Sequence, residues 1–201
     1  MSYIGYIPTD GFTGHGGPGG YNAKAISSSH NVISTSDYAK VYPLGTVATY
    51  FNSAIGGYGA CAYLKTDETI SGAGLVATLL ATSHTEVAVT LSNGMAIGCG
   101  PSAVSLSAVT DEYYGWYWIK GVCPDLYTDA TTKLSASTIS IISGVTLTAG
   151  ESFFAATAGE IDEYLETDVA IPCGHAINSG SGSGGTIGMG QVKLIGSGWG
   201  I

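Results

Sequence analysis

The chain has 201 residues and a formal net charge of −9 at pH 7, and its six cationic side chains are all lysine. The missing arginines and the negative charge argue strongly against a nucleic-acid partner, because phosphate and guanine recognition rely on guanidinium groups and positive potential. Only 10% of the residues are charged and 45% are hydrophobic, which leaves Ser, Thr, Gly and Tyr to keep the surface wetted. No apolar run reaches the roughly 20 residues that span a bilayer, so we expect no membrane partner.

Residues 1–44 are predicted to form an extended N-terminal arm. The segment is rich in Gly and Ser, carries isolated aromatic residues and shows no sustained strand or helix periodicity. It cannot bury enough area to offset its own ordering entropy, so we expect it to lie on its own domain or on a neighbouring chain. Aromatic side chains would anchor it and are candidate interface residues. They are Tyr3, Tyr6, Phe12, Tyr21, Tyr38 and Tyr42.

Residues 45–201 are predicted to form one β domain, because short β-forming runs alternate there with Gly, Asn, Asp and Ser. Many short strands with regular turn signals favour a single β-sandwich or barrel-like domain, so the expected fold class is all-β. Turns are predicted at 92–94 and 148–150. Strands are expected over 46–51, 60–65, 86–91, 103–109, 115–120, 137–142, 152–157, 169–178 and 187–195.

Helix is expected to be scarce, because each glycine in a helix interior costs roughly 1 kcal/mol against alanine and the chain has 31 glycines. The two candidates for helix are residues 74–83 and the acidic segment 159–168. The Gly/Ser stretch 179–185 has the composition of a linker. Since strand-like segments flank it closely on both sides, we interpret it as a flexible hairpin loop.

The most informative stretch is 111–121, which holds two tryptophans and three tyrosines. Strand alternation places Trp116 and Trp118 on one face, with Tyr117 and Ile119 on the other. Both faces are therefore apolar or aromatic, which predicts a strand that is buried on both sides or covered by a neighbouring subunit. Trp116 and Trp118 join the candidate interface residues on this ground. A sugar-binding aromatic platform is the alternative.

No arrangement in the sequence indicates catalysis, a metal site or a cofactor. The cysteines at 61, 99, 123 and 173 form no CxxC pair, and residues 1–10 lack the features of a signal peptide, so we expect buried reduced thiols. The four histidines are scattered along the chain. The acidic run 160–168 is interpreted as a solvated face, with a carboxylate pair for glycoside hydrolysis as the alternative.

Several segments together resemble a pattern of head structural proteins of tailed bacteriophages. The likeness spans about residues 42–195, and its most specific part is the Tyr-Gly-Trp strand 113–121 (YYGWYWIKG). The N-terminal arm is not part of the pattern. The other segments that carry the resemblance are 42–47 (YPLGTV), 60–65 (ACAYLK), 93–98 (NGMAIG), 103–110 (AVSLSAVT), 174–177 (GHAI) and 191–194 (QVKL).

The resemblance implies a capsid decoration or cement protein. Such a protein is a virion component on the outer capsid surface, made in the host cytoplasm, and it bridges major capsid proteins. It is usually a homo-oligomer and often a trimer, with no catalytic residues and no cofactor. Two other functions stay open: a tail-fibre or adhesin-like carbohydrate-binding module with exposed Trp116, Trp118 or Trp199, and a small hydrolase that uses Glu160, Asp162 or Glu163.

Overall fold

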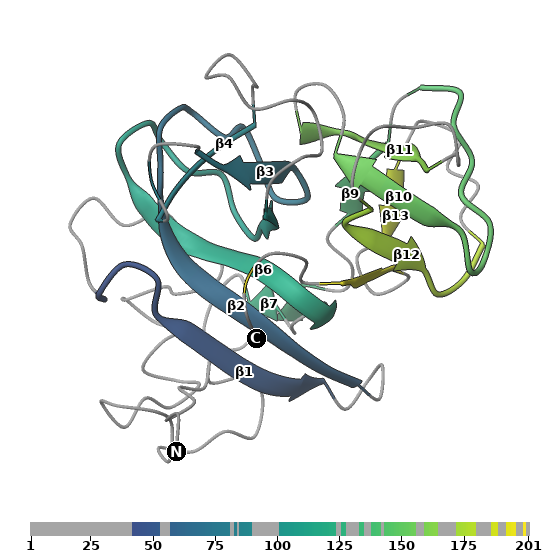
Figure 1. Ribbon diagram of the computed structural model, residues 1–201, viewed down its shortest axis with the longest axis horizontal. Helices are drawn as coiled ribbons and strands as arrows, with labels where there is room; N and C mark the ends of the chain where they lie inside the picture. Colours follow the sequence, from purple (N-terminus) through teal and green to yellow (C-terminus); the bar gives the residue numbers. More distant parts are fainter. Residues whose placement is uncertain are drawn as a thin grey trace.

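The structure is a computed structural model, and the residues that it describes form strands, turns and loops, apart from a 3-10 position at Gly159 (Figure 1). The predicted all-β fold is therefore confirmed. Within this part of the chain, no helix has the length and hydropathy needed to cross a bilayer. Residues 1–41 of the predicted arm lie outside the described part of the chain. The described residues are 42–52, 57–80, 83, 85–89, 101–123, 126–127, 133–134, 138–141, 143–155, 159–164, 172–179, 186–188, 192–195 and 199.

Two long antiparallel strands, β2 and β6, organise the fold. They pair directly along most of their length, from Gly59 opposite Gly121 to Lys65 opposite Tyr114. Three short strands close them into a five-stranded barrel in the order β2-β4-β3-β5-β6. The β2–β4 pair is parallel and the other pairs are antiparallel. The barrel strands are β2 (Gly57–Thr66), β3 (Val76–Leu79), β4 (Glu86–Ala88), β5 (Ser102–Ser105) and β6 (Tyr114–Val122).

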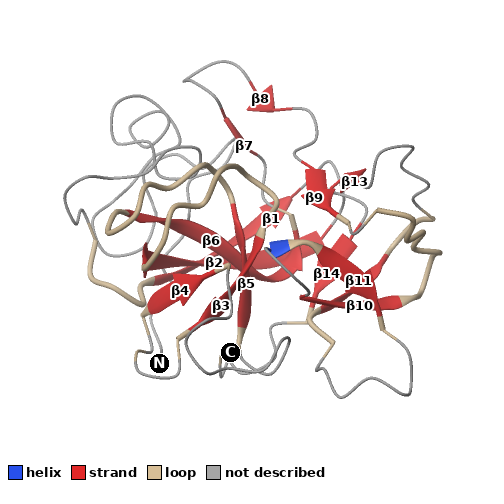
Figure 2. Ribbon diagram, turned by 90° about the horizontal axis from the view of Figure 1, so that it is seen from above, coloured by secondary structure: helices blue, strands red, loops and turns tan. Residues whose placement is uncertain are grey.

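Both long strands also carry strands outside the barrel. The first half of β2 pairs with β1, and the last residues of β6 pair with β14. From β14 the sheet continues through β12 and β10 to β11, which form the extension beside the barrel in Figure 2. These strands are β1 (Val47–Asn52), β10 (Ser152–Ala155), β11 (Ile161–Glu163), β12 (Gly174–Ala176) and β14 (Val192–Leu194). Two separate pairs join β7 (Leu126–Tyr127) to β8 (Lys133–Leu134) and β9 (Thr138–Ser140) to β13 (Thr186–Gly188).

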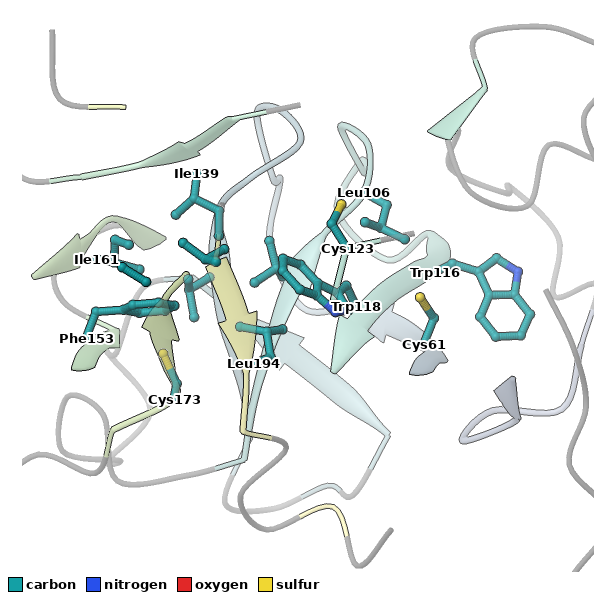
Figure 3. Packing of buried hydrophobic residues seen from close by; sticks show 14 of the residues in the cluster. Cys61, Leu106, Trp116, Trp118, Cys123, Ile139, Phe153, Ile161, Cys173 and Leu194 are labelled. Carbon is teal, nitrogen blue, oxygen red and sulfur yellow. The ribbon is translucent and has the colours of Figure 1, made fainter. Parts of the chain in front are cut away.

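Alternation along the two long strands divides the interior into two cores. One core takes side chains from all five barrel strands, including Tyr117 and Ile119 of β6, and so fills the barrel. The other core lies on the opposite face of β6, around Trp116 and Trp118. Figure 3 shows this second core, in which Trp118 lies among side chains of the extension such as Leu194. The predicted two-sided burial of this strand is confirmed, and both covers come from the same chain.

Both candidate helices are wrong where the structure describes them. Residues 76–79 form strand β3, and residues 161–163 form strand β11. All four residues of β3 are buried, including the polar Thr78, so no exposed position marks the strand period, and a short, mainly apolar run does not distinguish strand from helix. Residues 165–168 lie outside the described part.

The Gly/Ser stretch does not join a hairpin. Its flanking strands are β12 and β13, but β12 pairs with β14 and β13 pairs with β9. The predicted strand 187–195 is accordingly two strands, β13 and β14, with different partners. The turn at 148–150 is confirmed, because the Glu151 amide donates to the Thr148 carbonyl at 3.0 Å and Gly150 has a φ of +89°. The loop residues 180–185 and the predicted turn 92–94 lie outside the described residues.

The backbones of β6 and β2 lie close together at Gly121, so a substitution there should lower the stability of the fold. This residue has a φ of +78°, and an added Cβ would collide with the backbone oxygen of Tyr58. Gly144 has a φ of +92° with no atom within 4 Å of an added Cβ, so it is a matched control. Gly144→Ala should lower the free energy of unfolding by about 1 kcal/mol, and Gly121→Ala by roughly 3 kcal/mol or more. Equal losses in urea unfolding would show that the backbone contact is not tight.

Candidate functional site

Three of the candidate interface residues are core residues of this chain. Tyr42, Trp116 and Trp118 are all buried, and the ring centroid of Tyr42 lies 5.1 Å from that of Tyr63 and 5.5 Å from that of Trp116. Their burial removes these three side chains from the accessible surface. The β domain accordingly includes Tyr42, which the sequence assigned to the arm. The other candidates, Tyr3, Tyr6, Phe12, Tyr21 and Tyr38, lie outside the described residues.

All three tryptophans of the sequence lie in the described part, and none forms an exposed platform. Trp118 is fully buried, and its Nε1 donates to the backbone oxygen of Lys120 at 3.1 Å. Trp116 is buried with Nε1 lacking a hydrogen-bond partner within the described structure. Trp199 is half-buried, and its Nε1 donates to the backbone oxygen of Ser102 at 3.0 Å. A sugar platform needs exposed ring faces, which the two buried indoles do not offer.

The acidic segment is a strand in its described part. Asp162 and Glu163 are neighbours on β11, so their side chains point to opposite faces. Asp162 Oδ1 accepts a hydrogen bond from the backbone N–H of Glu163 at 2.8 Å. These two carboxylates therefore do not face each other as an acid and base pair would across a substrate. Glu160, just before the strand, is half-buried.

The candidate metal and thiol residues are dispersed. No group of three His, Cys, Asp or Glu side chains within the described residues could hold a metal ion. Cys61, Cys123 and Cys173 are buried in the core that surrounds Trp118, in agreement with their predicted burial. Cys99 and the histidines at 15, 30 and 84 lie outside the described residues, whereas His175 lies on β12.

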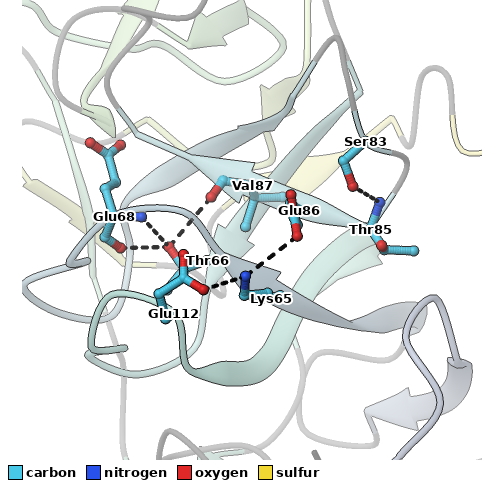
Figure 4. A network of polar contacts seen from close by, with 8 residues as sticks. All are labelled: Lys65, Thr66, Glu68, Ser83, Thr85, Glu86, Val87 and Glu112. Atoms are coloured by element: carbon cyan, nitrogen blue, oxygen red, sulfur yellow. Dashed lines mark hydrogen bonds and ion pairs between the residues drawn. The ribbon is translucent and has the colours of Figure 1, made fainter.

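The densest polar arrangement in the described residues surrounds Lys65 at one end of the barrel (Figure 4). Its Nζ lies 2.5 Å from Glu112 Oε2 and 3.5 Å from Glu86 Oε1. The hydrogen bond that Lys65 donates to Glu112 is the main cause that raises the pKa of Lys65, which keeps the amine protonated. A protonated amine is not a nucleophile, so this group serves to join β2, β4 and the turn before β6.

The turn that presents Glu112 is held by backbone hydrogen bonds and carries local strain. Glu112 has a φ of +66°, a conformation that favours glycine. Its N–H donates to the Thr66 carbonyl at 3.1 Å, and the Tyr113 N–H donates to the Thr110 carbonyl at 2.9 Å. Sequence reasoning missed this network, because Lys65 and its two partners are far apart in the chain and no local motif marks them.

Two polar groups lie inside the barrel close to this network. The Thr66 side chain is fully buried, and its hydroxyl donates to the Glu68 carbonyl at 2.6 Å. The Tyr117 hydroxyl is buried, and burial raises the pKa of this phenol far above its ordinary value. The Tyr117 phenol is therefore uncharged at neutral pH.

The comparisons with known proteins leave the family of the chain open. No protein-family model matches it, and neither curated protein sequences nor solved structures give a significant match. The residues and their geometry are therefore the grounds for a functional proposal.

The Lys65 network generates a prediction about stability at high pH. Because the folded pKa of Lys65 lies above its value of 10.5 in the unfolded chain, its contribution is complete below pH 10.5 and is lost as pH rises through the folded pKa. Solvent around the largely exposed Glu112 screens the pair, so Lys65→Met should cost no more than about 1 kcal/mol at pH 8. Urea unfolding at pH 8 to 11.5 should show the difference between wild type and variant shrinking at the alkaline end.

Lys193→Met is the matched control for this experiment, since Lys193 is an exposed lysine on β14. The Lys65→Met difference from wild type should shrink relative to the Lys193→Met difference over the same pH range. A Lys65→Met difference that follows the Lys193→Met difference at every pH would contradict the assignment of the raised pKa to the ion pairs.

Proposed function

We propose that this chain is a structural virion protein without catalytic activity, a decoration or cement subunit on the capsid of a tailed bacteriophage. It binds the major capsid protein shell from outside and stabilises it, and it assembles with further copies of itself as a homotrimer. The partners are therefore proteins, with no cofactor, nucleic acid or membrane.

The observation that carries the proposal is the place of the Tyr-Gly-Trp segment in the fold. The resemblance to phage head structural proteins is most specific over residues 113–121, and residues 114–122 form the strand that separates the two cores. The segment on which the resemblance mainly rests is therefore part of the framework of this fold and not a loop. The capsid role is what the resemblance implies.

The surface chemistry supports a protein that acts through broad contact area. Only 10% of all residues are charged. Exposed positions at turns are often polar and small, such as Thr69, Ser71 and Ser179. A surface of this kind suits wet, polar contacts that are individually weak and become strong when a symmetric lattice repeats them.

The carbohydrate-binding alternative has less support. It requires tryptophan rings in an exposed groove, whereas Trp116 and Trp118 are buried. The hydrolase alternative requires facing carboxylates, and the pair Asp162 and Glu163 does not meet this requirement, because these side chains point to opposite faces of β11. No observation on the described residues favours either one over capsid binding.

Binding to capsids is the direct test. Purified capsids of the phage that encodes the chain, stripped of it, should bind the added protein in co-sedimentation and should then lose their contents at a higher temperature. A variant that begins at Tyr42 keeps the aromatic cluster with Tyr63 and Trp116 and should bind several-fold more weakly, because the arm contributes contact area. Circular dichroism of this variant controls for folding.

The outcomes of the capsid experiment separate the parts of the proposal. Binding without a change in heat resistance would contradict cementing and leave bare decoration. No binding to stripped capsids, together with binding to a bacterial surface polysaccharide, would overturn the proposal in favour of a carbohydrate-binding module.

The proposed trimer is tested on the isolated protein. Sedimentation equilibrium should give about three times the chain mass of 20.4 kDa. A mass of 20.4 kDa at every concentration up to the millimolar range would contradict self-association before assembly.

A further inference from the structure

Trp199 occupies a place that the proposed function does not explain. It follows β14, which belongs to the extension, yet its indole packs against the core that fills the barrel. Its Nε1 donates to the backbone oxygen of Ser102, at the start of β5. An apolar ring contact and a directed hydrogen bond together specify an indole and not just any apolar side chain.

The arrangement of strands on β6 explains how Trp199 reaches this place. β2 occupies one edge of β6 and pairs with Tyr117, Trp118 and Gly121. β5 also pairs with Tyr117 and Trp118, and β14 also pairs with Gly121. Because each residue of β6 has one partner strand on each edge, β5 and β14 both lie on the edge opposite β2, one after the other. The end of β14 at Leu194 therefore meets the start of β5 at Ser102, where the barrel ends.

Among the described residues, the surroundings of the indole belong to the barrel, and contacts that do not include Trp199 fix their positions. Ser102 pairs with Thr78 of β3, and the Leu79 amide donates to the Pro101 carbonyl at 3.1 Å. The apolar side of the site comes from the barrel core, and the barrel strands are hydrogen-bonded to one another. The carbonyl that accepts from the indole is thus fixed by contacts that do not include Trp199.

We propose that the end of the barrel beside Ser102 is a binding site for an indole ring, filled in the native chain by Trp199. The ligand class is a planar, uncharged aromatic group with one N–H donor. Since the barrel supplies both the apolar contact and the acceptor, the site persists when the Trp199 side chain is removed and then binds free indole. This inference is independent of the capsid role.

The test is rescue of a truncated side chain by indole. Trp199→Gly should lower the melting temperature by roughly 4–10 °C, because apolar contact and one hydrogen bond are lost. Indole at a few millimolar should recover part of this loss in Trp199→Gly and should leave wild type unchanged. N-methylindole has nearly the same shape but no N–H donor, and it should recover less than indole.

Trp199→Phe tests the same site if Trp199→Gly does not fold. Trp199→Phe keeps an aromatic ring and loses the N–H donor, so its melting temperature should lie below that of wild type. If Trp199→Gly folds, the melting temperature of Trp199→Phe should lie above that of the glycine variant. Indole should not stabilise it, because phenylalanine fills the site. The proposal is overturned if indole stabilises wild type and Trp199→Gly equally, if it stabilises neither, or if Trp199→Phe is as stable as wild type.

Discussion

Burial of both faces of the β2–β6 ladder is the constraint on which the rest of the structure depends. A strand pair whose two faces are both apolar must be covered twice, and this chain covers it with parts of itself. On one face the two strands curl with β3, β4 and β5 into a closed barrel. On the other face the side chains around Trp118 are covered by the extension, through Phe153, Ile161 and Leu194 (Figure 3).

The same ladder accounts for one close pair of glycines and for the place of one group of charges. Gly59 and Gly121 face each other across the ladder, where the backbones approach too closely for a side chain. Charged groups are displaced to the ends of the long strands, as with Lys65 and Glu112. The outermost strand of the extension, β11, carries Asp162 and Glu163, and charges on an edge strand oppose unwanted pairing with other chains.

The part of the fold that sequence could predict is the part written in short-range patterns. The alternation over residues 116–119 predicted the central strand and both of its buried faces, because side-chain direction has a period of two residues in a strand. Alternation fails for Val76–Leu79, which is buried on every side.

Pairing partners and the candidate site depend on contacts that no local pattern records. The strands that flank the Gly/Ser stretch belong to different sheets, although they are adjacent in the chain. The Lys65 ion pairs join three separate segments, and the position of Trp199 follows from the order of β14 and β5 along β6. Burial of Trp116 and Trp118 was predicted from the sequence. Only the three-dimensional arrangement shows that the residues covering them belong to the same chain.

The shared core has a consequence for how this polypeptide unfolds. Phe153, Ile161 and Leu194 bury against the outside of the barrel wall, and their cluster includes Val76 and Val104 from that wall. The extension therefore buries its apolar side chains on a surface that β3, β5 and β6 complete, and β14 also pairs directly with β6. Because barrel and extension share this core, we expect them to unfold as one cooperative unit.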